Sequence, residues 1–230
     1  MKLRNKLVRL AYQKPELRKE LLPLLRTSME RQYLPSTTFK STHDFVFQLE
    51  YEYGQRLPEA YTLLKNLLVK VQDDFGLDLT KEIDHFEQII GLGKQAGSAY
   101  GKVLNVLYTT EGTKVGMPVP LAGLSLAAVS ISALFRAAKV FFRVLEQAIR
   151  YGRGAVAAKA SKKFLEHSRE VIAENIQSQE NTLLKGLKDY PGLVQEISRA
   201  MNYQKQLLKK IRDIQRTLPG KLDGIEYENS

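Results

Sequence analysis

Apolar residues recur every three or four positions along most of the chain, and most glycines and prolines fall between these runs. This spacing places the apolar side chains on one face of an α-helix. The sequence therefore predicts a mainly α-helical protein, folded as a helical bundle. The expected helices cover residues 3–10, 15–26, 58–75, 80–108 and 191–218.

Residues at the ends of these runs agree with the predicted boundaries. Gly76 suits the position directly after the last turn of a helix. Asp78 or Thr80 is expected to cap the following helix at its N-terminus. Pro219 and Gly220 are expected to close the C-terminal helix.

One short segment has a different period, because apolar and aromatic side chains alternate with other residues over nine positions. A period of two is typical of a strand. We expect a helix here as elsewhere, with a minor β segment near 44–53 as the alternative. The alternating residues are Phe45, Phe47, Leu49, Tyr51 and Tyr53.

The longest run without a formal charge covers residues 115–135. Its length is close to the roughly 20 residues that an α-helix needs to span a bilayer. Pro118 and Pro120 stand near its start, so the helix is expected to begin after them and to continue past Phe135. Two interpretations remain open for this run. It is either the buried central helix of a soluble bundle or a segment that enters or lies on a membrane.

The residues that follow predict a cationic, amphipathic helix. At about 100° per residue, four basic side chains fall on one side of this helix, while Val140, Phe141 and Val144 lie elsewhere. A basic amphipathic helix of this composition is typical of a membrane interface, and its cations also suit nucleic-acid phosphates. The candidate residues for binding lipid headgroups or another polyanion are Arg136, Lys139, Arg143, Arg150, Arg153, Lys159, Lys162 and Lys163.

Three glycines with a spacing of four, Gly93, Gly97 and Gly101, precede the uncharged run. Glycine costs about 1 kcal/mol relative to alanine inside a helix, so three at one spacing indicate a groove that another helix approaches closely. These glycines are our candidates for helix packing. A loop or a broken helix is the alternative.

The formal net charge of +10 is unevenly distributed along the chain. Residues 1–40 carry +7, residues 41–111 carry −5, residues 112–165 carry +8, and residues 166–230 are balanced. Two basic segments therefore flank an acidic one. A strong positive charge points to a polyanionic partner, either nucleic acid or an anionic membrane.

Residues that carry catalytic chemistry are scarce. The chain has no cysteine, and its three histidines, His43, His85 and His167, lack the spacing of metal ligands. Glu82 and His85 form a single E-x-x-H pattern, whereas di-iron bundles use two. No phosphate-binding glycine loop is present. The sequence predicts no enzyme, no cofactor, no metal site and no small-molecule substrate.

The N-terminal stretch Leu7–Leu25, LVRLAYQKPELRKELLPLL, resembles a short leader-like element of uncharacterised bacteriophage proteins, several of them virion-associated. The resemblance covers roughly the first 26 residues, about a ninth of the chain, and implies a phage or phage-derived origin. The same stretch is expected to form two short basic helices that dock on an acidic surface. It has neither the continuous apolar region nor the cleavage site of a secretory signal, so we expect cytoplasmic synthesis, with virion or membrane association afterwards.

Together these observations predict basic docking helices at 1–40 and a helical domain at 41–230, which contains the apolar and cationic segment 115–163. The expected function is a non-enzymatic interaction protein that associates with or inserts into an anionic membrane through 115–163, as a virion component in genome delivery. The alternative is a soluble assembly bundle whose basic face binds nucleic acid or an acidic protein. Protein partners or a homo-oligomer are expected in either case.

Overall fold

The computed structural model describes residues 42–111, 124–188 and 190–225, and the described residues are helical almost throughout. All of them belong to one compact unit that spans residues 39–230. The predicted docking helices at 1–40 lie outside the described residues. In chain order the elements are α3 (Thr42–Tyr51), the π-helix η2 (Glu52–Arg56), α4 (Leu57–Phe75), α5 (Thr80–Glu111), α6 (Leu124–Arg150), α7 (Gly154–Gln179), the π-helix η4 (Glu180–Leu184) and α8 (Pro191–Asp223).

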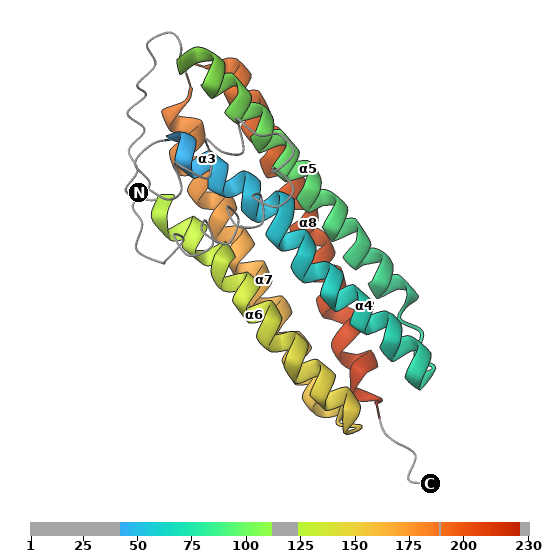
Figure 1. The fold of residues 1–230 in the computed structure, drawn as a ribbon. Coiled ribbons are helices and arrows are strands. Elements are labelled where there is room, and N and C mark those ends of the chain that lie inside the picture. The colour runs from blue at the N-terminus through green and yellow to red at the C-terminus, as the bar shows by residue number, and fades with distance from the viewer. Residues whose placement is uncertain (1–41, 112–123, 189, 226–230) are drawn as a thin grey trace, which may run out of the picture. The chain divides into compact units, whose positions relative to one another are not determined.

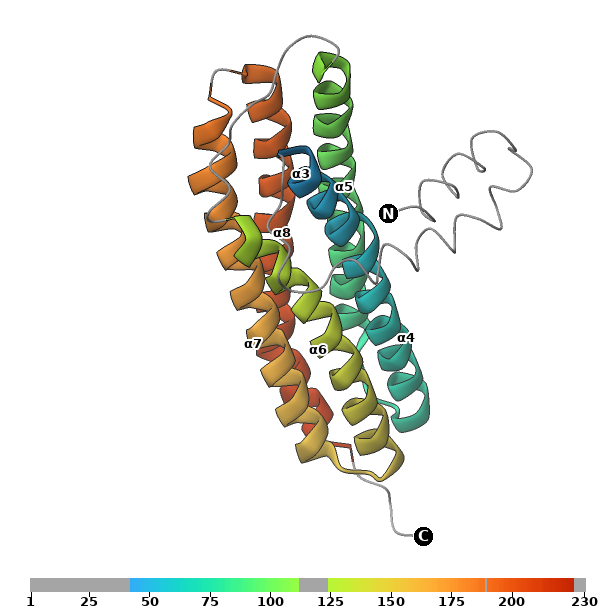
Figure 2. The ribbon, with the colours of Figure 1, turned by 60° about the vertical axis from the view of Figure 1, so that its left-hand side comes forward.

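The helices form a bundle (Figures 1 and 2), and when the continuous run α3–η2–α4 is counted as one rod, each rod packs on two neighbours. Helices α3, η2 and α4 follow one another without a break and lie along α5. Helix α5 packs on α8, α8 on α7, and α7 on α6, and the contact between α6 and α4 closes the ring. The predicted helical bundle is therefore confirmed for the described residues.

The alternative of a β segment near 44–53 is wrong, because these residues form α3 and the start of η2. Phe45, Leu49 and Tyr53 are fully buried at a spacing of four, which is the period of a helix face. The polar residues Gln48 and Glu52 are buried on the same helix. The Gln48 side-chain amide donates a hydrogen bond of 2.6 Å to the carboxylate of Glu52, four residues further along, so the two buried polar side chains pair with each other at a helical spacing.

Two of the predicted helix boundaries agree with the structure. Helix α4 ends at Phe75, and Gly76 follows it in the left-handed conformation with φ of 63°. Helix α5 begins at Thr80, whose backbone N–H donates to the carboxylate of Asp78 at 3.2 Å. That bond satisfies one of the donors that a helix N-terminus leaves free.

The C-terminal helix continues beyond its predicted end. Helix α8 runs through Pro219 and Gly220 to Asp223, so the expectation that these two residues close the helix was wrong. The tertiary structure favours the extra turn, because Leu222 is fully buried and Lys221 forms an ion pair with Glu82 of α5. These interactions outweigh the loss of the one backbone hydrogen bond that a proline cannot donate.

Helix α6 begins at Leu124, after Pro118 and Pro120, and continues to Arg150 as one helix. This agrees with the expected start and with the expected continuation past Phe135. Residues 115–123, and the side chains of 124–135, lie outside the described part of the structure. The choice between a buried and a membrane-bound uncharged run therefore stays a prediction.

Aromatic side chains from four helices meet between α6 and the rest of the bundle. Tyr61 of α4 lies 5.6 Å from Phe86 of α5 and 6.0 Å from Phe164 of α7, measured between ring centroids. Phe164 in turn stacks on Phe141 of α6 at 4.8 Å. Such pairs add to the hydrophobic stabilisation of a core. This aromatic cluster fixes α6 to both α4 and α7.

A fully buried polar network crosses the middle of the bundle. The Tyr53 hydroxyl donates to the Asn175 carbonyl at 3.1 Å, and the Gln204 amide donates to the Tyr100 hydroxyl at 2.5 Å. Tyr100 donates to the Gln179 carbonyl, and the Gln179 amide donates to both Asn175 and Gln204. Burial raises the pKa of both tyrosines, so their hydroxyls stay protonated. The network joins η2, α5, α7 and α8 at one level.

A second polar contact holds the C-terminal end of α8 against the N-terminal end of α5. The Lys221 ammonium lies 2.7 Å from the fully buried carboxylate of Glu82 and also donates to the backbone carbonyl of Asp78 at 2.5 Å. Burial acts to raise the pKa of Glu82, but the hydrogen bond and the positive charge of Lys221 act against it and hold the pKa below its usual value. Folding therefore favours the charged form of this carboxyl group.

Because the pKa of Glu82 is lower in the folded state, its stabilisation is present above the pKa of the unfolded chain and is lost as the pH falls through the folded value. We expect Glu82→Gln to lower the free energy of unfolding at neutral pH by about 1–3 kcal/mol. The difference from the wild type should shrink in acid. Urea unfolding across the acidic pH range measures both effects. Glu174→Gln, at an exposed position of α7, is the matched control. It should change neither the free energy of unfolding at neutral pH nor its dependence on pH.

Candidate functional site

Helices α6 and α7 form a hairpin with a tight connection at Tyr151, Gly152 and Arg153. Gly152 adopts the left-handed conformation with φ of 61°. Its N–H donates to the Ile149 carbonyl at 3.0 Å, and the N–H of Arg153 donates to the Ala148 carbonyl at 2.8 Å. These two bonds form a Schellman motif, which ends α6 and reverses the chain. The sequence around Gly152 thus fixes where the hairpin turns.

The start of α7 is held by the other end of the domain. The N–H of Gly154 donates to the carbonyl of Ile225 at 3.0 Å. A side chain at Gly154 would collide with the backbone of Asp223 and of Ile225. Glycine is therefore required at this position by close backbone approach. The contact seats the hairpin turn against the residues that follow α8.

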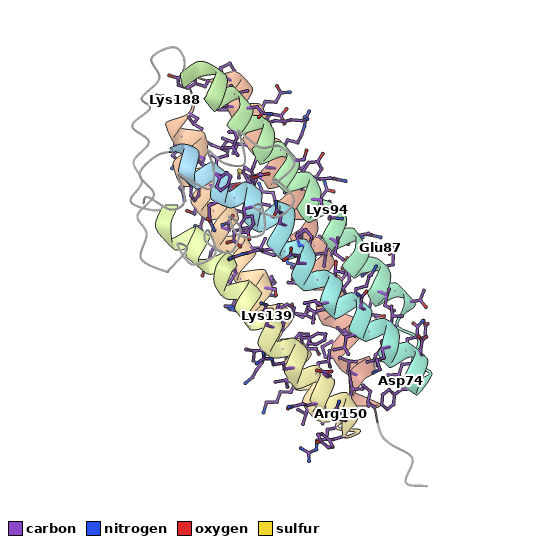
Figure 3. All side chains as sticks on the ribbon, in the orientation of Figure 1. Asp74, Glu87, Lys94, Lys139, Arg150 and Lys188 are labelled. Carbon is purple, nitrogen blue, oxygen red and sulfur yellow. The ribbon has the colours of Figure 1, made fainter. Side chains whose placement is uncertain are left out.

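The basic residues predicted from the sequence lie on the outside of this hairpin. Lys139 and Arg150 stand at two levels of α6 (Figure 3), and Arg153 lies in the turn, with its guanidinium 5.5 Å from the centre of the Tyr151 ring. Arg136 belongs to α6, but its side chain is not described. The side chains of the other seven candidates are exposed: Lys139, Arg143, Arg150, Arg153, Lys159, Lys162 and Lys163.

The electrostatic field of the hairpin is strongly positive. Between Lys139 and Lys163 the chain carries seven basic residues and a single acidic one, Glu146. Among the described residues, no ion pair is formed with Arg143, Arg150, Lys159, Lys162 or Lys163. Exposed cations on one surface raise the local concentration of anions and accelerate their association.

An apolar groove of about 850 Å³ opens between α6 and α7 on the same hairpin. We call it the α6–α7 groove. Its side chains are mostly aliphatic or aromatic, with two lysines and one histidine among them. Helix α6 contributes Ala137, Val140, Phe141 and Val144, and helix α7 contributes Ala155, Val156, Lys159, Ala160, Lys163, Phe164 and His167.

Large apolar side chains on this hairpin are unusually exposed. Val140 is 62% exposed, Tyr151 is 63% exposed and Val156 is 45% exposed. An apolar patch surrounded by charged side chains is typical of a site for another molecule. The site therefore combines two features on one surface, exposed cations and an uncovered apolar groove. Such a surface can bind amphiphilic anions.

Part of this site was missed by the sequence analysis. The spacing of Val140, Phe141 and Val144 was recognised, but the contribution of α7 was not. That side of the groove is lined by Val156, Ala160 and Phe164 at a spacing of four, with Ala155 and the alkyl stems of Lys159 and Lys163 between them. The long alkyl stem of a lysine covers apolar surface while its charge stays in water. The contribution of lysines to an apolar groove is therefore difficult to predict from the sequence.

The three predicted packing glycines all lie on α5, along the line where η2 crosses it. A Cβ atom at Gly97 would collide with the Cα atom of Gly54 and would stand 3.1 Å from the carbonyl oxygen of Glu50. A Cβ atom at Gly93 would meet the Leu57 side chain at 2.9 Å. At Gly101 the nearest atom would be 3.9 Å away, an ordinary contact. Gly93 and Gly97 therefore permit the close approach, whereas Gly101 does not limit it.

Two further features of the described residues bear on function. No three His, Asp or Glu side chains within them gather in an arrangement that could hold a metal ion. Among the described helices, none combines the length and the apolar character that crossing a bilayer requires. In comparisons with known proteins, no family model, no curated protein and no solved structure matched the chain.

The glycine contact on α5 yields a prediction with an internal control. Gly97→Ala should lower the free energy of unfolding by about 1–3 kcal/mol, because its methyl group overpacks the contact with Gly54. Gly91→Ala lies on the same helix but has open space around it, so it should raise stability by up to about 1 kcal/mol through helix propensity. Thermal and urea unfolding of both variants measure the difference. Equal effects would contradict the packing role of Gly97.

Proposed function

We propose that this protein is a non-enzymatic helical protein that binds anionic membrane surfaces through the α6–α7 hairpin. The observation that carries the proposal is the coincidence of seven exposed cations with an uncovered apolar groove on a single hairpin. Headgroup phosphates attract the cations, and the interfacial region of a bilayer accepts exposed Val and Tyr side chains.

The magnitude of the electrostatic attraction is sufficient for binding without a spanning helix. A basic residue close to an anionic leaflet contributes about 1 kcal/mol. The seven cations between Lys139 and Lys163, opposed by Glu146 alone, would together contribute about 6 kcal/mol, which corresponds to a Kd of roughly tens of micromolar. Because these charges are exposed, salt would weaken the attraction.

The exposed side chains at the hairpin turn also support membrane binding by this hairpin. Tyr151 presents an amphipathic ring beside the Arg153 guanidinium. Tyrosine is enriched where an apolar environment meets water, including the headgroup level of membranes. The turn therefore adds an interfacial anchor at the end of the cationic face.

The N-terminal resemblance to virion-associated bacteriophage proteins supplies a biological setting for this proposal. In that setting the protein would be a virion component that contacts a host membrane during genome delivery. Residues 1–40, with a charge of +7, would dock on an acidic protein surface. The two basic segments would then serve two different partners.

Vesicle flotation tests membrane binding directly. We expect the protein to float with phosphatidylglycerol-containing vesicles at low salt and to stay in the bottom fraction with pure phosphatidylcholine vesicles. Reversing three cations of the hairpin, Arg143→Glu, Lys159→Glu and Lys163→Glu, should lower the partition coefficient by at least about 100-fold. Circular dichroism checks that the variant keeps its helices.

The matched control reverses three exposed lysines on the acidic part of the domain, Lys70→Glu, Lys94→Glu and Lys102→Glu. It changes the net charge by the same amount but leaves the hairpin intact. This variant should retain most of the binding. An equal loss in both variants would show that net charge alone drives the association, and absence of flotation in the wild type would refute the proposal.

The same cations favour one second function, nucleic-acid binding by a soluble assembly protein. Exposed cations opposed by one acid suit a phosphate backbone, but phosphates leave the apolar groove unfilled, so we rank this function second. It predicts that affinity for duplex DNA falls linearly with salt on logarithmic axes, as counterions are released. Reversal of Arg136, Lys139, Arg143 and Arg150 should abolish that binding in a fluorescence anisotropy titration. Unchanged DNA affinity after the reversal would exclude this function.

A further inference from the structure

The α6–α7 groove has the size and the lining of a small-molecule site. Its volume of about 850 Å³ falls within the roughly 300–1,000 Å³ that such sites enclose. Sites for small molecules are lined mainly by apolar side chains, with a few polar groups that fix the orientation of the ligand. In this groove the polar groups are Lys159, Lys163 and His167, and all three lie on α7.

The floor of the groove is formed by two stacked aromatic rings. Phe141 and Phe164 lie 4.8 Å apart with only 5° between their planes, and both side chains are buried. Small residues stand on either side of this floor, Ala137 on α6 and Ala160 on α7. The small side chains leave room above the rings. Val140 and Val156 form the exposed edges.

The charges around the groove determine what kind of apolar ligand it suits. Lys159 and Lys163 are exposed and belong to the lining, whereas no acidic side chain among the described residues lines the groove. Lys139 and Arg143 flank Val140 and Val144 along α6. A neutral apolar ligand would leave the charges of Lys159 and Lys163 uncompensated. A ligand with an anionic group attached to an apolar chain matches both the apolar lining and the cationic edge of the groove.

We propose that the α6–α7 groove holds one acyl chain of an anionic phospholipid, with the lipid phosphate against Lys159 and Lys163. This inference rests on the proposed membrane binding and deepens it, because the membrane would be held by a specific lipid site as well as by surface charge. The acyl chain covers the exposed Val140 and Val156 side chains and lies on the Phe141 and Phe164 rings.

Charge argues against segment 1–40, and against the hairpin of a second copy, as the occupant. The segment 1–40 carries +7, so it would bring like charges to the cationic edge of the groove. The hairpin of a second copy is equally positive. Like charges held close together are unfavourable at an interface. A lipid phosphate instead brings the opposite charge to the lysines.

The chain contains no tryptophan, so a single introduced tryptophan reports on one position alone. Val140→Trp and Val156→Trp place the indole at the two edges of the groove. Leu63→Trp, at a 45% exposed position of α4, is the matched control. The probes are phosphatidylglycerol vesicles with acyl chains brominated near their middle, and monomeric lysophosphatidylglycerol with the same brominated chain.

With the brominated vesicles we expect at least twofold quenching of both groove tryptophans and little quenching of the control. Monomeric brominated lysophosphatidylglycerol should quench them equally, whereas its phosphatidylcholine counterpart should not. Adding Ala160→Phe to the Val140→Trp protein fills the groove. This change should remove the quenching by monomeric lipid while flotation with vesicles persists.

The possible outcomes separate this inference from the proposed function. Flotation without selective quenching of the groove tryptophans would overturn the acyl-chain site and leave surface binding in place. Quenching by monomeric lipid without flotation would support the acyl-chain site and refute membrane binding. A blue-shifted emission that depends on protein concentration and needs no lipid would show a second copy in the groove, and would overturn the inference.

Discussion

The architecture depends on a close backbone contact between two helices. At Gly97 of α5 the main chain of Gly54 in η2 approaches so closely that no side chain fits, whereas a Cβ atom at Gly54 would stand 3.4 Å from the Cα atom of Gly97. This contact lets the continuous α3–η2–α4 unit lie along α5. It also brings Tyr53 within 6.1 Å of Tyr100, measured between ring centroids. The buried polar network becomes possible only because these helices are so close.

The polar network gives the bundle a single register. Tyr53 lies within η2, and Gln179 directly precedes η4, so a π-helical turn adjoins the network on two of its four elements. A π-helical turn inserts one residue and shifts the phase of the side chains that follow. Sliding any of the four helices would leave a buried amide or hydroxyl unpaired. Because an unpaired buried polar group is costly, the network selects one packing among many.

The candidate site is a consequence of where α6 stands in the ring. Helix α6 packs on α7 and α4 through Ala138, Leu145 and Ile149, which are buried, while its outer side carries the cations. Between these two sides lies the apolar strip that borders α7. Small side chains at Ala137 and Ala160 keep this strip open. Charge and groove therefore meet on one hairpin because of packing geometry.

Apolar periodicity in the sequence predicted the helices at 58–75, 80–108 and 191–218, and the boundaries at Gly76 and Thr80 followed from local chemistry. The same reasoning located the cations and the glycines of α5, because a residue's charge or lack of a side chain is read directly. It left a strand open as the alternative for residues 44–53, and it failed for Pro219, since burial of Gln48, Glu52 and Leu222 depends on the packing of the whole bundle. The groove likewise required the tertiary structure, because only the packing of α6 against α7 brings the apolar side chains of both helices to one surface. The sequence alone determines which side chains lie on each face of a helix. Packing across the whole bundle determines which other helix each face contacts.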